Sequence, residues 1–252
     1  MTELDSQWCL PPAHLNLPGR TVHVWCATLD HPLEHWRRLA NVCDRQEHTR
    51  AARFQFNGDR RRFLAGRGLR RLILSAYLEE EPHALVFAKG RYGKPVLASS
   101  ELQFNVSHSH QLFVCAIAHN LNLGIDIEHV RPLPDAEQIA ARFFSAREYA
   151  SWGALPPSLQ LESFFACWTR KEAFIKAIEE GLSRPLDSFD VSVGSHELAQ
   201  LLHVADTPAA INRFSLYDLP TIKGYKAALA IEAQDYTIEC WRWTTKGSIG
   251  LC

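Results

Sequence analysis

Short apolar runs and alternating apolar and polar positions recur along this chain of 252 residues, and they predict strands. The predicted strands are residues 22–29, 84–88, 103–107, 112–118, 123–130, 213–219, 225–233 and 236–243. Two other stretches carry apolar residues at helical spacing. They predict a helical region from Trp36 to Leu78 and a long helix that follows residues 156–158.

Several residues mark where these elements begin and end. Ser145, with Glu148 three positions later, forms a capping-box pair that predicts the start of a helix. The long helix is expected to run through Glu180, and Gly181 is expected to cap its C-terminus. Residues 119–122 predict a hairpin turn between two strands.

The order of a strand, then helices, then strands occurs twice. We therefore predict an N-terminal lobe over residues 21–123 and a C-terminal lobe over residues 124–245. Residues 1–20 contain three prolines and show no periodic pattern of apolar residues, so they predict either an extended arm or a disordered terminus. Residues 246–252 are expected to form a tail.

The composition restricts the class of protein. Hydrophobic residues make up 46% and charged residues 22%, which is ordinary for a globular protein, and the net charge of −1 excludes a general nucleic-acid coat. Seven cysteines without a CxxC pair predict free thiols in a reducing cytoplasm. The start of the chain lacks the pattern of a signal peptide, and no apolar stretch reaches 18 residues, so we expect no membrane span.

Arginine is concentrated in one stretch. Residues 45–71 carry nine arginines opposed only by Glu47 and Asp59, so the local charge is 9 − 2 = +7. The guanidinium group suits bidentate contacts with phosphate, and the confinement of these arginines to one stretch favours a compact polyanion as the ligand. The alternative is a solvated helix face. The nine are Arg45, Arg50, Arg53, Arg60, Arg61, Arg62, Arg67, Arg70 and Arg71.

Acidic residues suggest a metal site. In Gly124-Ile125-Asp126-Ile127-Glu128 the alternation of a strand puts both carboxylates on one face, where a divalent cation would offset their repulsion. Carboxylates combined with substrate phosphates are typical ligands of Mg²⁺. The alternative is the exposed edge of a half-buried strand.

A third carboxylate lies on the long helix. Trp168, Glu172 and Lys176 stack at four-residue spacing beside an apolar stripe, so an uncompensated Glu172 would be costly. An ion pair with Lys176 is one way to compensate the charge of Glu172. The other is a metal site that Glu172 shares with Asp126 and Glu128, and three oxygen donors favour Mg²⁺ or Mn²⁺ over Zn²⁺.

Two polar turns are candidate anion sites. Residues 104–109 read FNVSHS, where Ser107 and His108 could bind an anion or simply form an exposed hairpin turn. Residues 90–95 form a glycine turn that presents Lys94, without the pattern of a phosphate-binding P-loop.

The order GKP, FNVSHS, GIDIE, RFFSxxEY and WTRKEAFIKAIEEGLSRPLDSF resembles the 4′-phosphopantetheinyl transferase superfamily, in particular its Sfp-type branch, over roughly residues 45–232. The resemblance implies an α+β pseudodimer of two similar lobes, each with a small antiparallel sheet packed on helices. It also implies that coenzyme A lies between the lobes. Such enzymes move the 4′-phosphopantetheine arm of coenzyme A onto a serine of an acyl or peptidyl carrier protein and release adenosine 3′,5′-bisphosphate.

The same resemblance implies roles for individual residues. Asp126, Glu128 and Glu172 would hold Mg²⁺, or Mn²⁺ in its place, against the pyrophosphate. Glu172 would also remove or direct the proton of the carrier serine, and Lys176 would neutralise the leaving phosphate. The contacts expected with the nucleotide phosphates are those of Arg50, Arg53, Arg62, Lys94, Ser107 and His108.

The chain departs from the family pattern at two positions. Glu47 and Phe63 stand where some members carry a lysine or threonine near the 3′-phosphate of coenzyme A. Acidic carrier domains are the implied partners, with no nucleic acid or membrane, and a two-lobed chain can form its cleft as a monomer. Two other functions stay open, a metal-dependent phosphodiester or nucleotide hydrolase and a non-catalytic nucleotide- or RNA-binding module.

Overall fold

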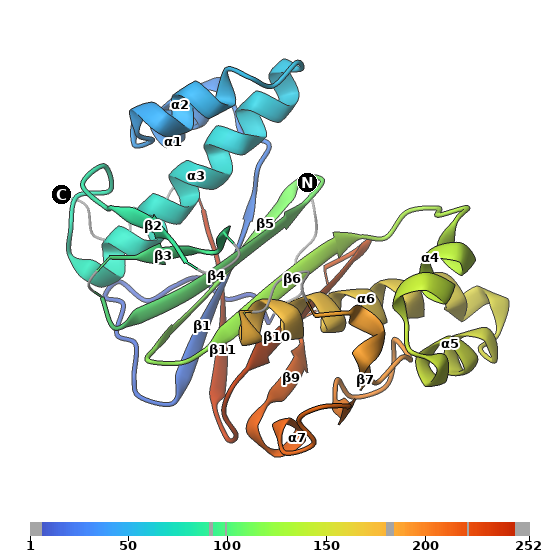
Figure 1. Ribbon diagram of the computed structural model, residues 1–252. Coiled ribbons are helices and arrows are strands. Elements are labelled where there is room, and N and C mark those ends of the chain that lie inside the picture. Colours follow the sequence, from blue (N-terminus) through green and yellow to red (C-terminus); the bar gives the residue numbers. More distant parts are fainter. Residues whose placement is uncertain (1–6, 91–92, 99, 180–183, 221, 245–252) are drawn as a thin grey trace.

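The computed structural model describes residues 7–90, 93–98, 100–179, 184–220 and 222–244. Its secondary structure is a mixture of helices and small sheets, which confirms the α+β class (Figure 1). The predicted cap Gly181 and the predicted tail lie outside the described residues. No helix in the described ranges is both long and apolar enough to span a bilayer.

The described part of the N-terminal half contains one long helix, two shorter helices and five strands. The predicted helical region separates into three helices, α1, α2 and α3, and a capping box of Asp44 and Glu47 starts the second of them. In chain order the elements are β1 (Thr21–Thr28), α1 (Leu33–Asn41), α2 (Arg45–Ala51), α3 (Asn57–Leu78), β2 (Phe87–Lys89), β3 (Pro95–Leu97), β4 (Leu102–Ser109) and β5 (Leu112–His119).

The C-terminal half again pairs a strand with a long helix. Its elements are β6 (Leu123–His129), α4 (Ala136–Phe143), α5 (Ala146–Gly153), α6 (Pro157–Ile178), a 3₁₀ turn (Leu186–Ser188), β7 (Phe189–Val191), β8 (Leu201–Val204), α7 (Ala210–Arg213), β9 (Ser215–Asp218), β10 (Tyr225–Ile231) and β11 (Thr237–Arg242). The capping box of Ser145 and Glu148 starts α5 as predicted. Helix α6 ends at Ile178, followed by Glu179 in the left-handed region with φ of 54°.

The strands form two main sheets. The first has the order β11-β1-β5-β4 and the second the order β6-β10-β9. The prediction of purely antiparallel sheets is wrong for the first, because β11 runs parallel to β1. β11 lies within residues 124–245, which the sequence assigned to the C-terminal lobe, yet it pairs with β1 in the first sheet. Such pairing between the ends of a chain is not encoded in local hydrophobic patterns.

Alternating side chains place the two sheets between the long helices. Val24 and Ile125 belong to a buried cluster that joins the sheets, whereas Trp25 on the opposite face of β1 packs in the cluster that contains α3 residues. On the second sheet Ala228 packs in the cluster that contains α6 residues. The layers are therefore α3, first sheet, second sheet and α6, and Asp126 faces α6 because it alternates with Ile125.

The described part of the N-terminal arm packs on the rest of the protein. The Trp8 indole is buried, and its Nε1–H donates to the carbonyl of Pro220. Cys9 forms a parallel bridge with Trp241 of β11. These contacts bind Trp8 to the segment that follows β9 and Cys9 to the edge strand β11 of the first sheet.

Candidate active site

Polar side chains at alternate positions of β4 bind β6 without a main-chain ladder between the two strands. Asn105 Oδ1 accepts a hydrogen bond from a β6 amide at 2.9 Å. Ser107 Oγ donates to Asp126 Oδ1 at 2.8 Å, and Ser109 Oγ donates to Glu128 Oε2 at 2.7 Å. The FNVSHS segment of β4 therefore orients both carboxylates of β6. Sequence analysis missed Asn105 and Ser109, although the two-residue period of a strand puts them on the face of Ser107.

Asp126 has one satisfied and one open carboxylate oxygen. Lys176 Nζ lies 2.7 Å from Asp126 Oδ1, so the ammonium binds Asp126 across the interface of β6 and α6. The other oxygen, Asp126 Oδ2, is buried and has no hydrogen-bond partner among the described residues. An unsatisfied buried carboxylate oxygen is costly unless a cation or a donor binds it.

Burial and mutual repulsion perturb the other two carboxyl groups. Burial raises the pKa of Glu172, and the charges of Asp126 and Glu128 raise that pKa further against the opposing charge of Lys176. Burial also raises the pKa of Glu128, which the hydrogen bond from Ser109 opposes. The three carboxylates are therefore within electrostatic reach of one another, and the negative charge that they share is only partly compensated.

Gly124 permits the close approach of β6 to α6. A Cβ atom at this position would lie 2.2 Å from the carbonyl oxygen of Ala173 and 2.7 Å from Cβ of Lys176. Any larger residue would push the strand from the helix. The glycine of the GIDIE segment thus sets the separation at which Asp126 reaches the α6 side chains.

The three carboxylates do not form a closed metal cage. Within the described ranges no group of three or more histidine, cysteine, aspartate or glutamate side chains has an arrangement that could hold a metal ion. Mg²⁺ needs fewer protein ligands, because it keeps waters and takes oxygen atoms from substrate phosphates. The open Asp126 Oδ2 and the only partly compensated Glu128 and Glu172 fit this kind of half-built site.

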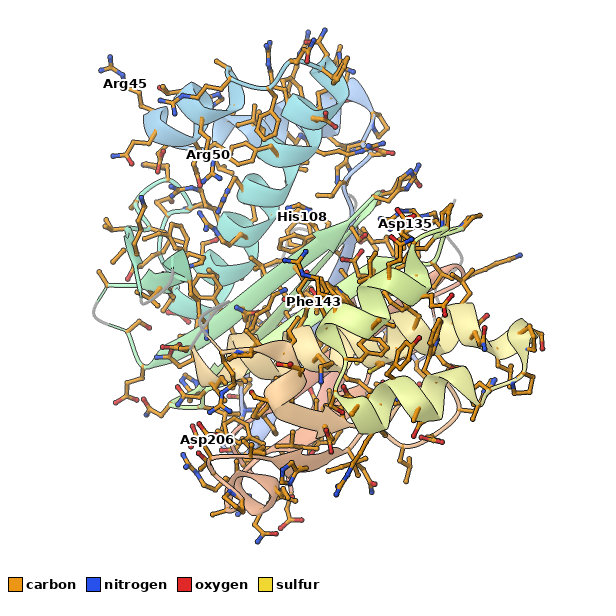
Figure 2. The ribbon with its side chains drawn as sticks, turned by 45° about the vertical axis from the view of Figure 1, so that its right-hand side comes forward. Arg45, Arg50, His108, Asp135, Phe143 and Asp206 are labelled. Atoms are coloured by element: carbon orange, nitrogen blue, oxygen red, sulfur yellow. The ribbon has the colours of Figure 1, made fainter. Side chains whose placement is uncertain are left out.

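A pocket of about 710 Å³ lies between α2, α3 and β4 and reaches Lys176 of α6. Figure 2 shows Arg50 in the helical layer above the strand that carries His108. Burial lowers the pKa of His108, and the charges of Arg67 and Lys176 lower it further. A neutral imidazole ringed by cations in a large pocket is suited to an anionic ligand.

The pocket contains some of the predicted phosphate contacts and not others. Arg50, Arg62, Ser107 and His108 line it, and Arg62 also pairs with Asp30 at 2.9 Å. Arg53 lies instead on a neighbouring shallow groove that also contains Arg45, Arg50 and Lys89. Lys94 is not among the described residues that line either cavity, and its Nζ instead donates to the Leu123 carbonyl at 3.0 Å.

Two arginines that the sequence analysis did not assign also line the pocket. Burial lowers the pKa of Arg67, whose guanidinium lies 5.0 Å from the ring centre of Phe63. Arg70 Nε is buried without a hydrogen-bond partner among the described residues. Both belong to the arginine-rich stretch, and their spacing of three residues on one helix face was the signal available in the sequence.

The two departures from the family pattern have different places. Glu47 is buried, is not among the described residues that line the pocket, and binds Arg70 and Arg71 at 2.8 Å each. Phe63 lines the pocket and contacts the guanidinium groups of Arg50 and Arg67. Glu47 is therefore structural, and Phe63 gives the pocket an aromatic wall.

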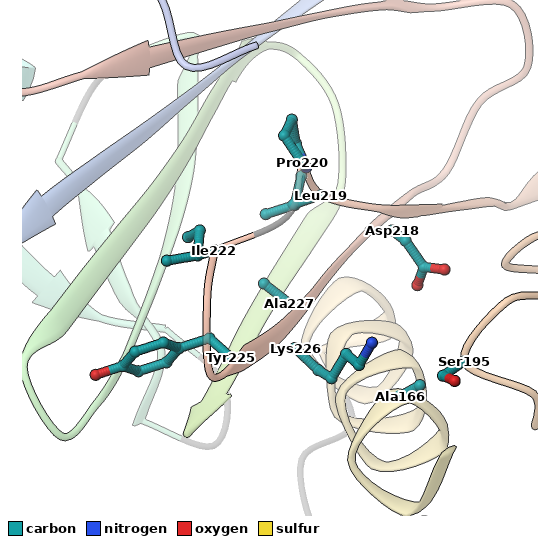
Figure 3. A pocket seen from close by; sticks show the side chains of 9 residues that line it. All are labelled: Ala166, Ser195, Asp218, Leu219, Pro220, Ile222, Tyr225, Lys226 and Ala227. Carbon is teal, nitrogen blue, oxygen red and sulfur yellow. The ribbon is translucent and has the colours of Figure 1, made fainter. Parts of the chain in front are cut away.

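A third, smaller cavity of about 90 Å³ lies beside α6 (Figure 3). Asp218 in its wall is held by Arg170, and Lys226 pairs with Glu162 at 3.0 Å. None of the predicted site residues is among the described residues that line this cavity.

Comparison with known proteins identifies the class. A family model described as the 4′-phosphopantetheinyl transferase superfamily matches residues 122–230, and one described as 4′-phosphopantetheinyl transferase, N-terminal, matches residues 30–120. The chain belongs to the 4′-phosphopantetheinyl transferase superfamily, and both the family and the transferase activity that the motifs predicted are confirmed.

Individual relatives are similar over most of the chain. The 4′-phosphopantetheinyl transferase HetI of Nostoc sp. (strain PCC 7120) is 37% identical over 95% of this chain and 100% of its own length. The 4′-phosphopantetheinyl transferase Sfp of Bacillus subtilis (strain 168) is 32% identical over 82% of this chain and 91% of its own length. The 4′-phosphopantetheinyl transferase gsp of Aneurinibacillus migulanus is 34% identical over 68% of both chains.

Proposed function

We propose that this chain transfers the 4′-phosphopantetheine group of coenzyme A to a serine of an acyl or peptidyl carrier protein in a Mg²⁺-dependent reaction. The observation that carries the proposal is the arrangement at the lobe interface. An incomplete carboxylate site, with its open Asp126 oxygen, adjoins a cation-lined pocket through Lys176. Phosphoryl transfer needs this combination of charge neutralisation and positioning more than it needs covalent help.

Asp126, Glu128 and Glu172 are the residues that would hold the cation. Mg²⁺, or Mn²⁺ in its place, would supply neutralisation of the pyrophosphate charge. Ser107 and Ser109 hold the first two carboxylates in orientation by their hydrogen bonds. Lys176 binds Asp126 Oδ1 and lines the pocket, so its ammonium would also neutralise charge on the leaving phosphate.

Glu172 is the proposed proton acceptor for the carrier serine. A serine hydroxyl is a weak nucleophile until a positioned base takes its proton. Burial raises the pKa of Glu172 and thereby strengthens this carboxylate as a base. Its place on α6, one turn from Lys176, puts base and cation on one helix face.

The 710 Å³ pocket is the proposed site of the nucleotide end of coenzyme A. Arg50, Arg62 and Arg67 supply charge there, and His108 supplies a hydrogen-bonding ring. The open donor of Arg70 Nε supports an anionic occupant. We assign His108 to the 3′-phosphate.

This assignment predicts a selective change in affinity. Replacement of His108 by alanine is expected to raise the Kd for coenzyme A by about 10- to 100-fold, since it removes a hydrogen bond to a charged group. The Kd for 3′-dephospho-coenzyme A should change little. Isothermal titration of both ligands measures this, with the exposed His203→Ala as a control. An equal loss for both ligands would place His108 elsewhere on the nucleotide.

An aromatic and basic surface beside the carboxylates suits an acidic carrier domain. Phe143 of α4 packs edge-on against Trp168 of α6 with ring centres 5.8 Å apart, and both are partly exposed. Arg142 covers Phe143, and the exposed Arg131 lies over Phe165. Trp168 precedes Glu172 by one turn, so a carrier bound here would bring its serine to the proposed base.

We further propose that the two lobes are versions of one unit. The strand orders β1-β5-β4 and β6-β10-β9 correspond, and α3 and α6 each have 22 residues. Arg71 and Lys171 each lie 14 residues after the start of their helix, and each binds the glutamate of a capping box, Glu47 or Glu148. Such a pseudodimer forms its cleft within one chain, which supports a monomeric enzyme.

A cytoplasmic location is part of the proposal. The buried thiols of Cys26, Cys43, Cys115 and Cys167 form no disulfide. Thiols of this kind are typical of proteins in a reducing compartment.

Intact-protein mass spectrometry tests the function. With Mg²⁺ and coenzyme A, a panel of apo carrier proteins is expected to gain the mass of one phosphopantetheine group, and a chelator should prevent the gain. Breakdown of coenzyme A without an acceptor would instead favour the hydrolase alternative. A folded enzyme that modifies no carrier and leaves coenzyme A intact would refute the proposal.

A further inference from the structure

Lys94 makes contacts that differ from those of a phosphate ligand. Its Nζ lies 2.9 Å from Glu179 Oε1, 3.0 Å from the Leu123 carbonyl and 3.5 Å from the Lys176 carbonyl. Its side chain is only 11% exposed. An ammonium has three donors, and each of them here has an acceptor within the protein. None is left for a nucleotide phosphate.

The three acceptors belong to the C-terminal lobe, whereas Lys94 immediately precedes β3 in the N-terminal lobe. Leu123 begins β6, and Lys176 and Glu179 lie at the end of α6. A cation at this end of a helix also interacts favourably with the carbonyls of its last turn. One side chain therefore joins a hairpin of one lobe to the strand and the helix that carry the reacting groups of the other.

The contact lies next to the closest approach of β6 and α6. Gly124 follows Leu123, and it has room for no side chain against Ala173 and Lys176. Two residues further along β6, Asp126 binds Lys176. A small slip of the strand along the helix at Leu123 would change the separation of Asp126 from the α6 side chains.

We propose that Lys94, together with Glu179, is a positioning residue of the transfer reaction, which fixes the register of β6 on α6 and so aligns Asp126 with Lys176 and Glu172. It acts through the protein and does not touch coenzyme A. This inference builds on the proposed transfer reaction and adds a role for the GKP segment that differs from the phosphate contact expected from sequence.

Steady-state kinetics separates the two roles. Lys94→Met keeps the length of the side chain without its charge and is expected to lower kcat about tenfold, as a slightly misplaced reacting group does. The KM and the directly titrated Kd for coenzyme A should stay close to wild type. Glu179→Gln should lower kcat in the same way, and the double variant should lose little more than either single variant, because the two act as one contact. Lys223→Met, at an exposed lysine, is the control.

Two results would overturn the proposal. One is a large rise in the Kd for coenzyme A in Lys94→Met with a normal Glu179→Gln, which would make Lys94 a phosphate ligand. The other is normal kcat in both variants. If Lys94→Met does not fold, Glu179→Gln carries the test alone.

A second readout keeps this test separate from the proposed function. Hydrogen exchange of the amides in the last turn of α6 and at the start of β6 should accelerate in both variants and not in the control. If the wild type modifies no carrier, the transferase proposal fails, but hydrogen exchange still tests the contact of Lys94 with Glu179. Unchanged amide exchange in both variants would refute that contact.

Discussion

Replacement of Asp126 by asparagine is expected to lower kcat for carrier modification by a factor on the order of 10²–10³, the usual cost of losing one electrostatic group at a reacting phosphate. Asparagine retains an oxygen that can accept from Ser107, so the hydrogen bond at Oδ1 survives. It loses the charge that Lys176 binds and the open oxygen that we assign to the cation.

Carrier mass shift over time measures this effect, with urea unfolding of the same protein as the check on folding. The matched control is Asp190→Asn, at a buried aspartate of β7 whose arginine partner Arg147 lies at 3.7 Å. Normal turnover in Asp126→Asn would remove Asp126 from the site. A loss that is equal in the control would show that the effect is one of stability.

Removal of the Lys171 charge is expected to be the most destabilising of the changes considered. Lys171 Nζ lies 2.7 Å and 2.6 Å from the two oxygens of Glu148 and 2.7 Å from the Phe189 carbonyl, and both charged side chains are 1% exposed. Lys171→Met leaves the Glu148 carboxylate buried without its counter-ion. Such a break costs about 3–5 kcal/mol in the free energy of unfolding.

Urea titration followed by circular dichroism measures the loss. Lys226→Met breaks the more exposed pair with Glu162, for which the expected loss is about 0–1 kcal/mol. Combining Lys171→Met with Glu148→Gln should restore part of the stability, because no unpaired charge remains. A Lys171→Met protein as stable as the Lys226→Met protein would contradict the buried pair.

The sequence predicted the features that depend on local periodicity. The alternation of apolar and acidic residues in GIDIE predicted that Ile125 and Asp126 lie on opposite faces of the strand. In the structure Ile125 packs in the core and Asp126 lies on the opposite face. The capping box of Ser145 and Glu148 also needs only four adjacent residues. Helix α4 and the short strands β7 and β8 lacked such a signal, since elements of this length carry too few apolar positions to define a period.

The roles of the individual arginines could not be predicted, because they depend on contacts between residues that are far apart in the sequence. Sequence analysis counted the arginine-rich stretch as one basic region. In the fold Arg71 is buried and neutralised by Asp44 and Glu47, while Arg67 lines the pocket. Long-range packing separates the structural arginines from those that line the pocket. It also places the Lys176 ammonium in an ion pair with Asp126.

The most direct test of the account is a titration of Mn²⁺ followed by electron paramagnetic resonance, with coenzyme A bound. The wild type should bind one equivalent of Mn²⁺, and the combined change of Asp126→Asn, Glu128→Gln and Glu172→Gln should abolish this binding while coenzyme A still occupies the pocket. Equal binding of Mn²⁺ by the wild type and the triple variant would contradict the assignment of these three carboxylates.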